Sequence, residues 1–314
     1  MLLIPRRRLL SKPELALVLI TVVWGATFLV VHIAVQYSGP WFFVGMRFLA
    51  AGIISAVIFA KALSGLTWKE IGAGSAIGVM IYLGYGLQTV GLQSISSSTS
   101  AFITALYVPL VPILQWMVFR KAPQLLTWIG VALAFIGLIL LADPGSVGFT
   151  FGAGEIVTLV STLPIALEII LISVFAGKVH LGRVTVVQLL VAGLLALATM
   201  PVVGEQVPEF SWVWLGAAVA LGAASCIIQL TMNWAQRSVS PTRATIIYAA
   251  EPVWAGIIGR LAGDRLPAIA ILGAVFIVAG AVVSELNPRK RAAVGNTETA
   301  VAPDDEPEPA LEDR

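Results

Sequence analysis

Apolar stretches that are long enough to cross a lipid bilayer dominate the pattern of hydrophobic and polar positions along this chain. A membrane-spanning helix needs about 20 mainly apolar residues. By this measure the sequence predicts ten spans: 15–35, 41–60, 70–92, 97–119, 125–142, 154–176, 184–203, 212–235, 241–262 and 266–286. None of them alternates apolar with polar residues along its length, as a transmembrane β-strand would. The expected fold is therefore an all-α polytopic membrane protein with ten transmembrane helices.

The composition narrows the class of protein further. Hydrophobic residues make up 58% of the 314 residues and charged residues only 11%, whereas soluble domains contain about 25% charged residues. A water-soluble enzyme, a nucleic-acid-binding protein and a disordered chain are therefore excluded. The single cysteine, Cys226, has no partner for an internal disulfide. The predicted partners are the lipid bilayer and a small-molecule substrate, with no nucleic acid.

Lys and Arg residues gather on one side of the predicted spans. That side holds Arg6, Arg7, Arg8, Lys12, Lys61, Lys69, Arg120, Lys121, Lys178, Arg183, Arg237, Arg243, Arg289, Lys290 and Arg291. The linkers on the other side hold Arg265 together with Asp143, Glu205, Glu209 and Asp264. The positive-inside rule then predicts that both termini are cytoplasmic. Residues 1–12 are expected to form an N-terminal tail, and 287–314 a tail that is basic, then acidic and disordered.

An internal repeat divides the chain into two halves. Residues 97–137 recur at 240–280 with a constant offset that places Pro109 on Pro252 and Gly137 on Gly280. Matches of proline and glycine are informative because these residues constrain the backbone. The sequence thus predicts two five-helix repeats, 13–142 and 152–286. An odd number of spans in each repeat inverts the second one in the membrane, and inverted repeats are typical of transporters.

Short motifs in both repeats carry a family resemblance. In chain order they are Trp24-Gly25-Ala26-Thr27-Phe28, Arg47-Phe48, Tyr107-Val108-Pro109, Glu251-Pro252-Val253 and Gly263-Asp264-Arg265-Leu266. Their order and spacing resemble the drug/metabolite transporter superfamily, in particular its ten-span EamA-type members. The chain departs from the family pattern at Asp264, whose first-repeat counterpart is Lys121. The resemblance implies a multi-pass protein of the bacterial inner membrane that exports amino acids or other small metabolites.

Two acidic residues lie well away from the ends of predicted spans, where a charged side chain costs roughly 2.5–3.5 kcal/mol to insert. Glu168 lies midway along its span, and Glu251 precedes Pro252, which removes a backbone donor. Each acid either lines a cavity, binding a substrate amine or carrying a proton, or hydrogen-bonds a neighbouring helix in its protonated form. Arg47 either pairs with one of these acids, binds a carboxylate, or neutralises neighbouring helices. Glu251 and Glu168 are the candidates for proton coupling, and Pro109 and Pro252 for hinges or kinks.

Uncharged polar and aromatic residues recur at helical spacing on several spans. Lipid does not satisfy such groups, so these faces are expected to turn toward a shared wet cavity or to form interhelical hydrogen bonds. With the two acids they form the predicted substrate pathway: Trp24, Tyr82, Tyr85, Gln88, Thr104, Tyr107, Glu168, Gln229, Asn233, Tyr248 and Glu251.

Other residues are predicted to serve the fold alone. Tryptophans near the ends of spans are typical interfacial anchors, here Trp41, Trp68, Trp212 and Trp214. Glycines spaced seven residues apart favour close helix packing, here Gly130 with Gly137 and Gly273 with Gly280.

Taken together, the sequence predicts a secondary transporter that works by alternating access, with proton coupling as an option. No Gly-x-x-x-x-Gly-Lys-Ser/Thr motif is present, so ATP is not the direct energy source. A passive channel or facilitator is the alternative. An intramembrane enzyme is less favoured, because the only histidines, His32 and His180, form no His-Glu-x-x-His motif. No catalytic residue, metal or cofactor is predicted, and a homodimer is an open alternative.

Overall fold

The computed structural model describes residues 11–95, 97–120, 122–141, 152–261 and 268–285, and across these residues it contains helices and no strands. Six helices are long and apolar enough to cross a membrane: α1 (Lys12–Ala34), α2 (Pro40–Ile58), α4 (Trp68–Gly91), α8 (Ala153–Phe175), α9 (Leu181–Thr199) and α10 (Trp212–Ala235). Shorter apolar helical segments are Tyr107–Phe119, Leu125–Gly137 and Ile271–Gly280. The structure thus has the all-helical character of a polytopic membrane protein. The count of ten spans and the side on which the termini lie stay predictions.

Two of the long helices begin at capping boxes on the same end of the bundle. The backbone N–H of Ser11 donates to the Glu14 carboxylate at 2.7 Å, and the Ser11 hydroxyl accepts from the Glu14 N–H. Thr67 and Glu70 repeat this arrangement at the start of α4. Each reciprocal pair satisfies backbone donors that the first helical turn leaves open. The polar residues that precede these apolar runs therefore set where α1 and α4 begin.

The predicted spans 97–119 and 241–262 are each broken into two helices, close to the prolines for which the sequence predicts a hinge or kink. The first consists of α5 (Ser97–Thr104) and α6 (Tyr107–Phe119), and the second of α11 (Pro241–Tyr248) and α12 (Glu251–Leu261). Pro109 and Pro252 lie in the first turns of α6 and α12, where a missing N–H costs nothing. Since proline cannot bond the carbonyl four residues earlier and clashes with it, the preceding helix ends at this point. Their role as hinges stays a prediction.

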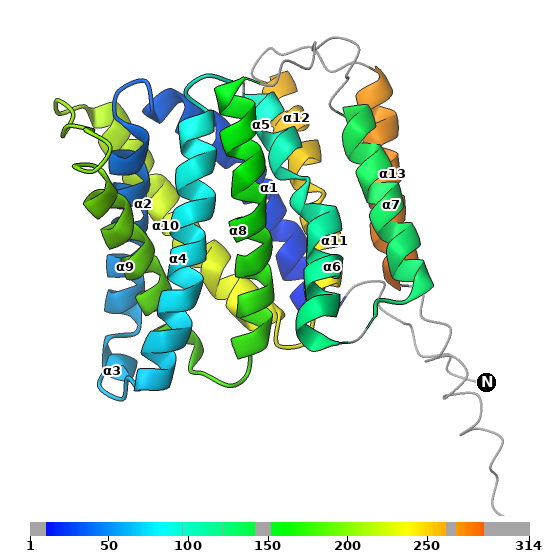
Figure 1. Cartoon of the computed structure of the whole chain (residues 1–314), viewed down its shortest axis with the longest axis horizontal. Coiled ribbons are helices and arrows are strands. Elements are labelled where there is room, and N and C mark those ends of the chain that lie inside the picture. Colours follow the sequence, from blue (N-terminus) through cyan, green and yellow to red (C-terminus); the bar gives the residue numbers. More distant parts are fainter. Residues whose placement is uncertain (1–10, 96, 121, 142–151, 262–267, 286–314) are drawn as a thin grey trace, which may run out of the picture.

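A peripheral pair of helices, α7 (Leu125–Leu141) and α13 (Ala268–Glu285), lies side by side at one edge of the bundle (Figure 1). A Cβ atom on Gly137 would lie 2.5 Å from the Gly273 carbonyl oxygen, and one on Gly280 would lie 2.5 Å from the Gly130 carbonyl oxygen. The glycine spacing therefore does permit the close packing that the sequence predicted. The remaining helices form the main body, in which α4 packs against α8 and α9, and α2 against α9 and α10. The short α3 (Ala60–Leu63) follows α2.

Two of the four predicted tryptophan anchors instead belong to the core. Trp41 and Trp214 are only 8% and 7% exposed. The Trp41 ring packs on Tyr82 with the ring centroids 5.3 Å apart, and the Trp214 indole donates to the Glu209 carbonyl at 3.0 Å. Both side chains point inward because neighbouring residues supply aromatic and carbonyl partners there. The other two, Trp68 and Trp212, are exposed as expected of anchors.

Several sequence predictions lie outside the described residues. They concern most of the N-terminal tail, Lys121, Asp143, the Gly263–Leu266 motif with Asp264 and Arg265, and the C-terminal tail.

Candidate functional site

A pocket of about 430 Å³, its opening included, lies between helices from both halves of the chain. Helices α1, α4, α5 and α6 supply Trp24, Thr27, Phe28, Tyr85, Gln88, Thr104 and Tyr107. Helices α8, α10 and α12 supply Ile165, Glu168, Ile169, Met232 and Glu251. The breaks between α5 and α6 and between α11 and α12 both adjoin this pocket, because Thr104, Tyr107 and Glu251 flank them.

The pocket brings together most, but not all, of the residues predicted for the substrate pathway. Seven line it: Trp24, Tyr85, Gln88, Thr104, Tyr107, Glu168 and Glu251. Four are not among its lining residues: Tyr82, Gln229, Asn233 and Tyr248. Sequence reasoning missed five lining residues, Thr27, Phe28, Ile165, Ile169 and Met232. Thr27 and Phe28 belong to the Trp-Gly motif of the first span, which was the signal that could have found them.

Aromatic side chains form one wall of the pocket and hold one another in place. The Trp24 indole N–H donates to the Tyr85 hydroxyl at 3.1 Å. The Trp24 ring meets Tyr248 edge-on, with the centroids 5.1 Å apart, and Tyr248 in turn accepts from the Gln236 amide. Edge-to-face pairs of this kind stabilise beyond their buried area. Tyr248 therefore supports the wall from behind rather than lining the pocket.

The two buried acids differ in how their carboxylates are held. Glu168 is 2% exposed, and its Oε1 accepts a hydrogen bond from Gln229 Nε2 at 2.7 Å. Glu251 is the first residue of α12 and is 9% exposed. Among the described residues, none donates a hydrogen bond to its side chain, so the Glu251 carboxylate is open to the pocket.

Gln229 belongs to a chain of buried amides that runs away from the pocket. Its Oε1 accepts from Gln188 Nε2 at 2.7 Å, and Gln188 Oε1 accepts from Asn233 Nδ2 at 3.2 Å. Asn233 also donates to the Thr185 hydroxyl at 3.0 Å. Because each carbonyl is occupied by the next amide, the Gln229 N–H groups are left pointing at Glu168. Sequence reasoning missed Gln188, since a single glutamine on an apolar helix gives no periodic signal.

Arg47 pairs with neither acid, so the ion pair, one of the alternatives that the sequence left open, does not form. Its Nε donates to the Ser225 hydroxyl at 2.9 Å. The guanidinium carbon lies 5.3 Å from the centroid of the Phe48 ring and 5.2 Å from that of Tyr85. The cation is thus stabilised by ring faces and a helix–helix hydrogen bond, behind the wall that Tyr85 forms.

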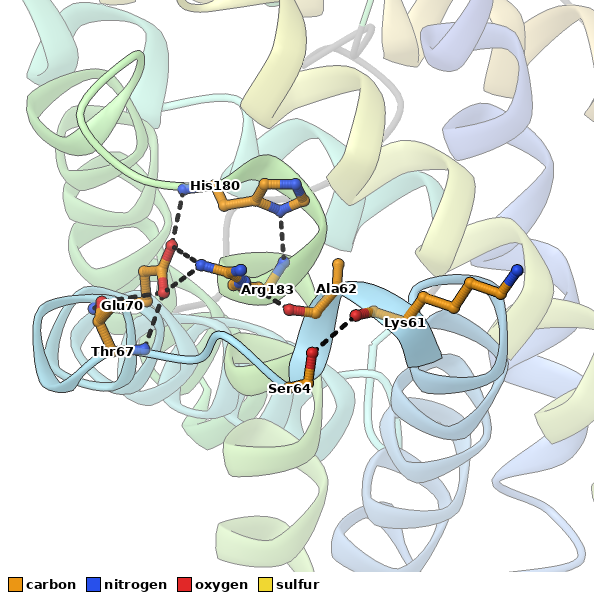
Figure 2. A network of polar contacts seen from close by, with 7 residues as sticks. All are labelled: Lys61, Ala62, Ser64, Thr67, Glu70, His180 and Arg183. Atoms are coloured by element: carbon orange, nitrogen blue, oxygen red, sulfur yellow. Dashed lines mark hydrogen bonds and ion pairs between the residues drawn. The ribbon is translucent and has the colours of Figure 1, made fainter.

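At the end of the bundle where α4 begins, a polar network joins the two halves (Figure 2). The Glu70 carboxylate accepts from the Thr67 N–H at 2.9 Å, from the His180 N–H at 3.1 Å and from Arg183 Nη1 at 3.3 Å. Arg183 Nε also donates to the Ala62 carbonyl at 2.6 Å. Arg183 and His180 come from the second half and the other residues from the first.

A second ion pair, between Arg243 of α11 and Glu14 of α1, joins the halves at the start of those helices. Sequence reasoning used these arginines only to assign the cytoplasmic side. It did not predict that they bridge the halves.

Apolar helices around one pocket that two halves share and that buried acids line are the architecture of a membrane transporter. The EamA-like transporter family model matches residues 11–142 and 152–286. The chain belongs to this family, which is part of the drug/metabolite transporter superfamily.

Known relatives bear similar descriptions. The chain is 28% identical over 277 residues to an "Uncharacterized transporter" of Archaeoglobus fulgidus, covering 87% of this chain and 85% of that protein. It is 28% identical over 287 residues to the "Uncharacterized inner membrane transporter YedA" of Escherichia coli K12, covering 86% and 90%. A crystal structure matches 90% of this chain and 99% of its own with a TM-score of 0.73 at 17% identity, which shows a shared fold. The protein is accordingly a multi-pass membrane transporter.

Proposed function

We propose that the protein is a secondary transporter of the bacterial inner membrane that exports amino acids or related small metabolites by alternating access. The observation that carries this proposal is the pocket itself, to which both halves of the chain contribute walls and which two buried carboxylates line. Transporters built from inverted repeats bind their substrates at such a junction. The name of the Escherichia coli relative supports the assignment to the inner membrane.

Two features support alternating access. The broken helices α5/α6 and α11/α12 end beside the pocket, and discontinuous helices form the binding sites of many transporters. The ion pairs of Arg183 with Glu70 and of Arg243 with Glu14 connect the halves at one end. If the halves separate there, these pairs break, so the pairs favour closure at that end.

Proton coupling is assigned chiefly to Glu251 because its carboxylate is open to the pocket, whereas Gln229 holds Glu168. The titratable groups that share the pocket with Glu251 are Glu168, Tyr85 and Tyr107. The Arg47 cation lies behind Tyr85. A carboxyl group that releases its proton when an ammonium group binds exchanges one positive charge for another, so substrate and proton move in opposite directions.

Substitution of Glu251 tests the coupling. We expect Glu251→Gln to remove the dependence of transport on a pH gradient, because an amide at this position cannot exchange a proton. The measurement is counterflow of a mixed amino-acid pool into liposomes that contain the purified protein, with and without the gradient. The matched control is Glu209→Gln, which changes an exposed acid between α9 and α10 and should leave the gradient effect unchanged.

Two outcomes would contradict parts of the proposal. Gradient-dependent transport by Glu251→Gln would remove the proton role of Glu251. Flux through the unaltered protein that does not depend on the pH gradient would identify a passive facilitator instead.

A further inference from the structure

We propose that the pocket selects small organic cations, whose charged group is an ammonium and which carry no carboxylate, over zwitterionic amino acids. This inference deepens the proposed function and rests on it, because it takes the pocket to be the substrate site. It names the amines among the amino-acid-related metabolites as the preferred class. Three features of the pocket support this inference: the sign of its charges, the hydrogen bonds that its donors already make within the wall, and its aromatic side chains.

The ionisable side chains that the structure describes around the pocket are acids and phenols. Glu168 and Glu251 line it together with two tyrosines, and no Lys, Arg or His is among the described lining residues. A buried charge without a partner is costly, whereas an ammonium beside a carboxylate is compensated. An entering amine therefore meets compensating charge, and an entering carboxylate does not.

Three of the hydrogen-bond donors that could compensate a carboxylate are already engaged within the wall. The Trp24 indole donates to Tyr85 at 3.1 Å, the Gln88 amide to the Thr104 hydroxyl at 3.0 Å, and the Thr27 hydroxyl to the Trp24 carbonyl at 2.8 Å. The donors that remain are the hydroxyls of Tyr85, Thr104 and Tyr107 and the second Gln88 N–H, which are neutral and carry no positive charge to offset a carboxylate. The lining acids, in contrast, offer acceptors directly.

Arg47 does not supply the missing cation. A guanidinium recognises a carboxylate through two parallel N–H donors in one plane, which requires the fork to face the ligand. Here Nε is bonded to Ser225, the side chain is 3% exposed, and the guanidinium packs over the Tyr85 ring. Tyr85 belongs to the pocket wall and Arg47 does not, so the ring lies between the cation and the ligand space.

The wall suits an ammonium group that is attached to an apolar body. Trp24, Phe28, Tyr85 and Tyr107 all line the pocket, and aromatic faces attract cations, most strongly when water is excluded. Glu251, which lacks a donor among the described residues, is the carboxylate that is open to such a group. Glu168, already held by Gln229, adds a second acidic group to the same pocket.

Ligand triplets that differ in the carboxylate or the amine alone test the inference. The probes are phenethylamine, phenylalanine and 3-phenylpropanoate, and likewise isoamylamine, leucine and 4-methylpentanoate. Binding to the purified full-length chain in detergent is measured by calorimetry, which needs no flux and avoids leakage of amines through lipid. We expect each amine to bind about tenfold or more tightly than its amino acid, since the latter buries an uncompensated carboxylate, and the acids not to bind.

A variant locates the binding. Glu251→Gln should weaken amine binding about tenfold or more, while Glu209→Gln should leave it unchanged. The comparison of the three ligands on the unaltered chain stands even if a variant fails to fold. Amino acids that bind as tightly as their amines, acids that bind best, or amines that do not bind at all would each overturn the inference.

Failure of this inference is distinct from failure of the proposed function. Amino acids that cross liposomes with no preference for amines would leave the transporter proposal standing and remove the selectivity. Tight amine binding without any protein-dependent flux would leave the selectivity standing and contradict the proposed transport.

Discussion

At the residue scale, the buried amides behind the pocket show how an apolar interior fixes the orientation of polar groups. Gln188 is fully buried and both donates to Gln229 and accepts from Asn233. A buried polar group that loses its hydrogen-bond partner stays unsatisfied, and the protein then bears the full free-energy cost of desolvating that group. The direction of the whole chain of amides, and with it the hydrogen bond to Glu168, therefore depends on Gln188.

We expect Gln188→Leu to destabilise the protein by about 1–3 kcal/mol, because it removes the partner of the Gln229 carbonyl and one partner of the Asn233 amide. Thermal unfolding of the detergent-solubilised protein measures this. The matched control is Gln124→Leu at an exposed position before α7, which should change stability little. If Gln188→Leu unfolds at the same temperature as the unaltered chain, the amide chain contributes nothing to stability.

At the element scale, the α7–α13 pair depends on backbone contact rather than on side-chain interdigitation. The position of a Cβ atom on Gly137 lies 2.5 Å from the Gly273 carbonyl oxygen and 2.9 Å from the Ile277 amide nitrogen. Backbone atoms cannot rotate away as a side chain does. Any side chain at this position must therefore push the two helices apart.

We expect Gly137→Ala to destabilise the protein by about 1–3 kcal/mol through this overpacking. Gly216→Ala in α10 is the matched control, because a Cβ there has no atom within 4 Å and alanine favours the helix. Unfolding temperatures of the two variants in the same detergent give the comparison. Equal stability of both variants would show that the glycine contact is dispensable.

At the scale of the whole molecule, the ion pairs that join the halves are expected to control access to the pocket. The carboxylates of Glu70 and Glu14 are 7% and 4% exposed, so neither ion pair is fully solvated. Both lie at the end that the positive-inside rule predicts to be cytoplasmic. Their loss should lower the free-energy cost of opening the pocket toward that side.

Labelling from each side of the membrane tests this expectation. With Cys226→Ser removing the native thiol, Met232→Cys places one thiol in the pocket wall. Combined Glu14→Gln and Glu70→Gln should raise its labelling rate by an impermeant maleimide from the cytoplasmic side about fivefold, as expected for roughly 1 kcal/mol. Arg237→Gln, an exposed charge at the same end, is the control. A faster reaction from the outer side alone would contradict the expected direction.

The sequence by itself determined the helical membrane class, the buried acids and the prolines beside which two spans break. These features depend on local sequence. The length of an apolar stretch determines whether a helix can span the membrane, and a proline ends the helix that precedes it. A single Glu within an apolar stretch must face protein rather than lipid. The sequence alone could therefore predict that Glu168 and Glu251 face protein, with a cavity and a neighbouring helix as the two alternatives.

Tertiary structure alone decided which polar groups face the pocket and which bond to one another. Gln229 and Asn233 lie on a polar face that the sequence revealed, yet their partners, Gln188 and Thr185, come from another helix. Arg47 takes Ser225, 178 residues away, instead of an acid. Which partners a side chain takes depends on how the helices rotate and pack against each other. Periodicity along a single helix carries no information about that rotation.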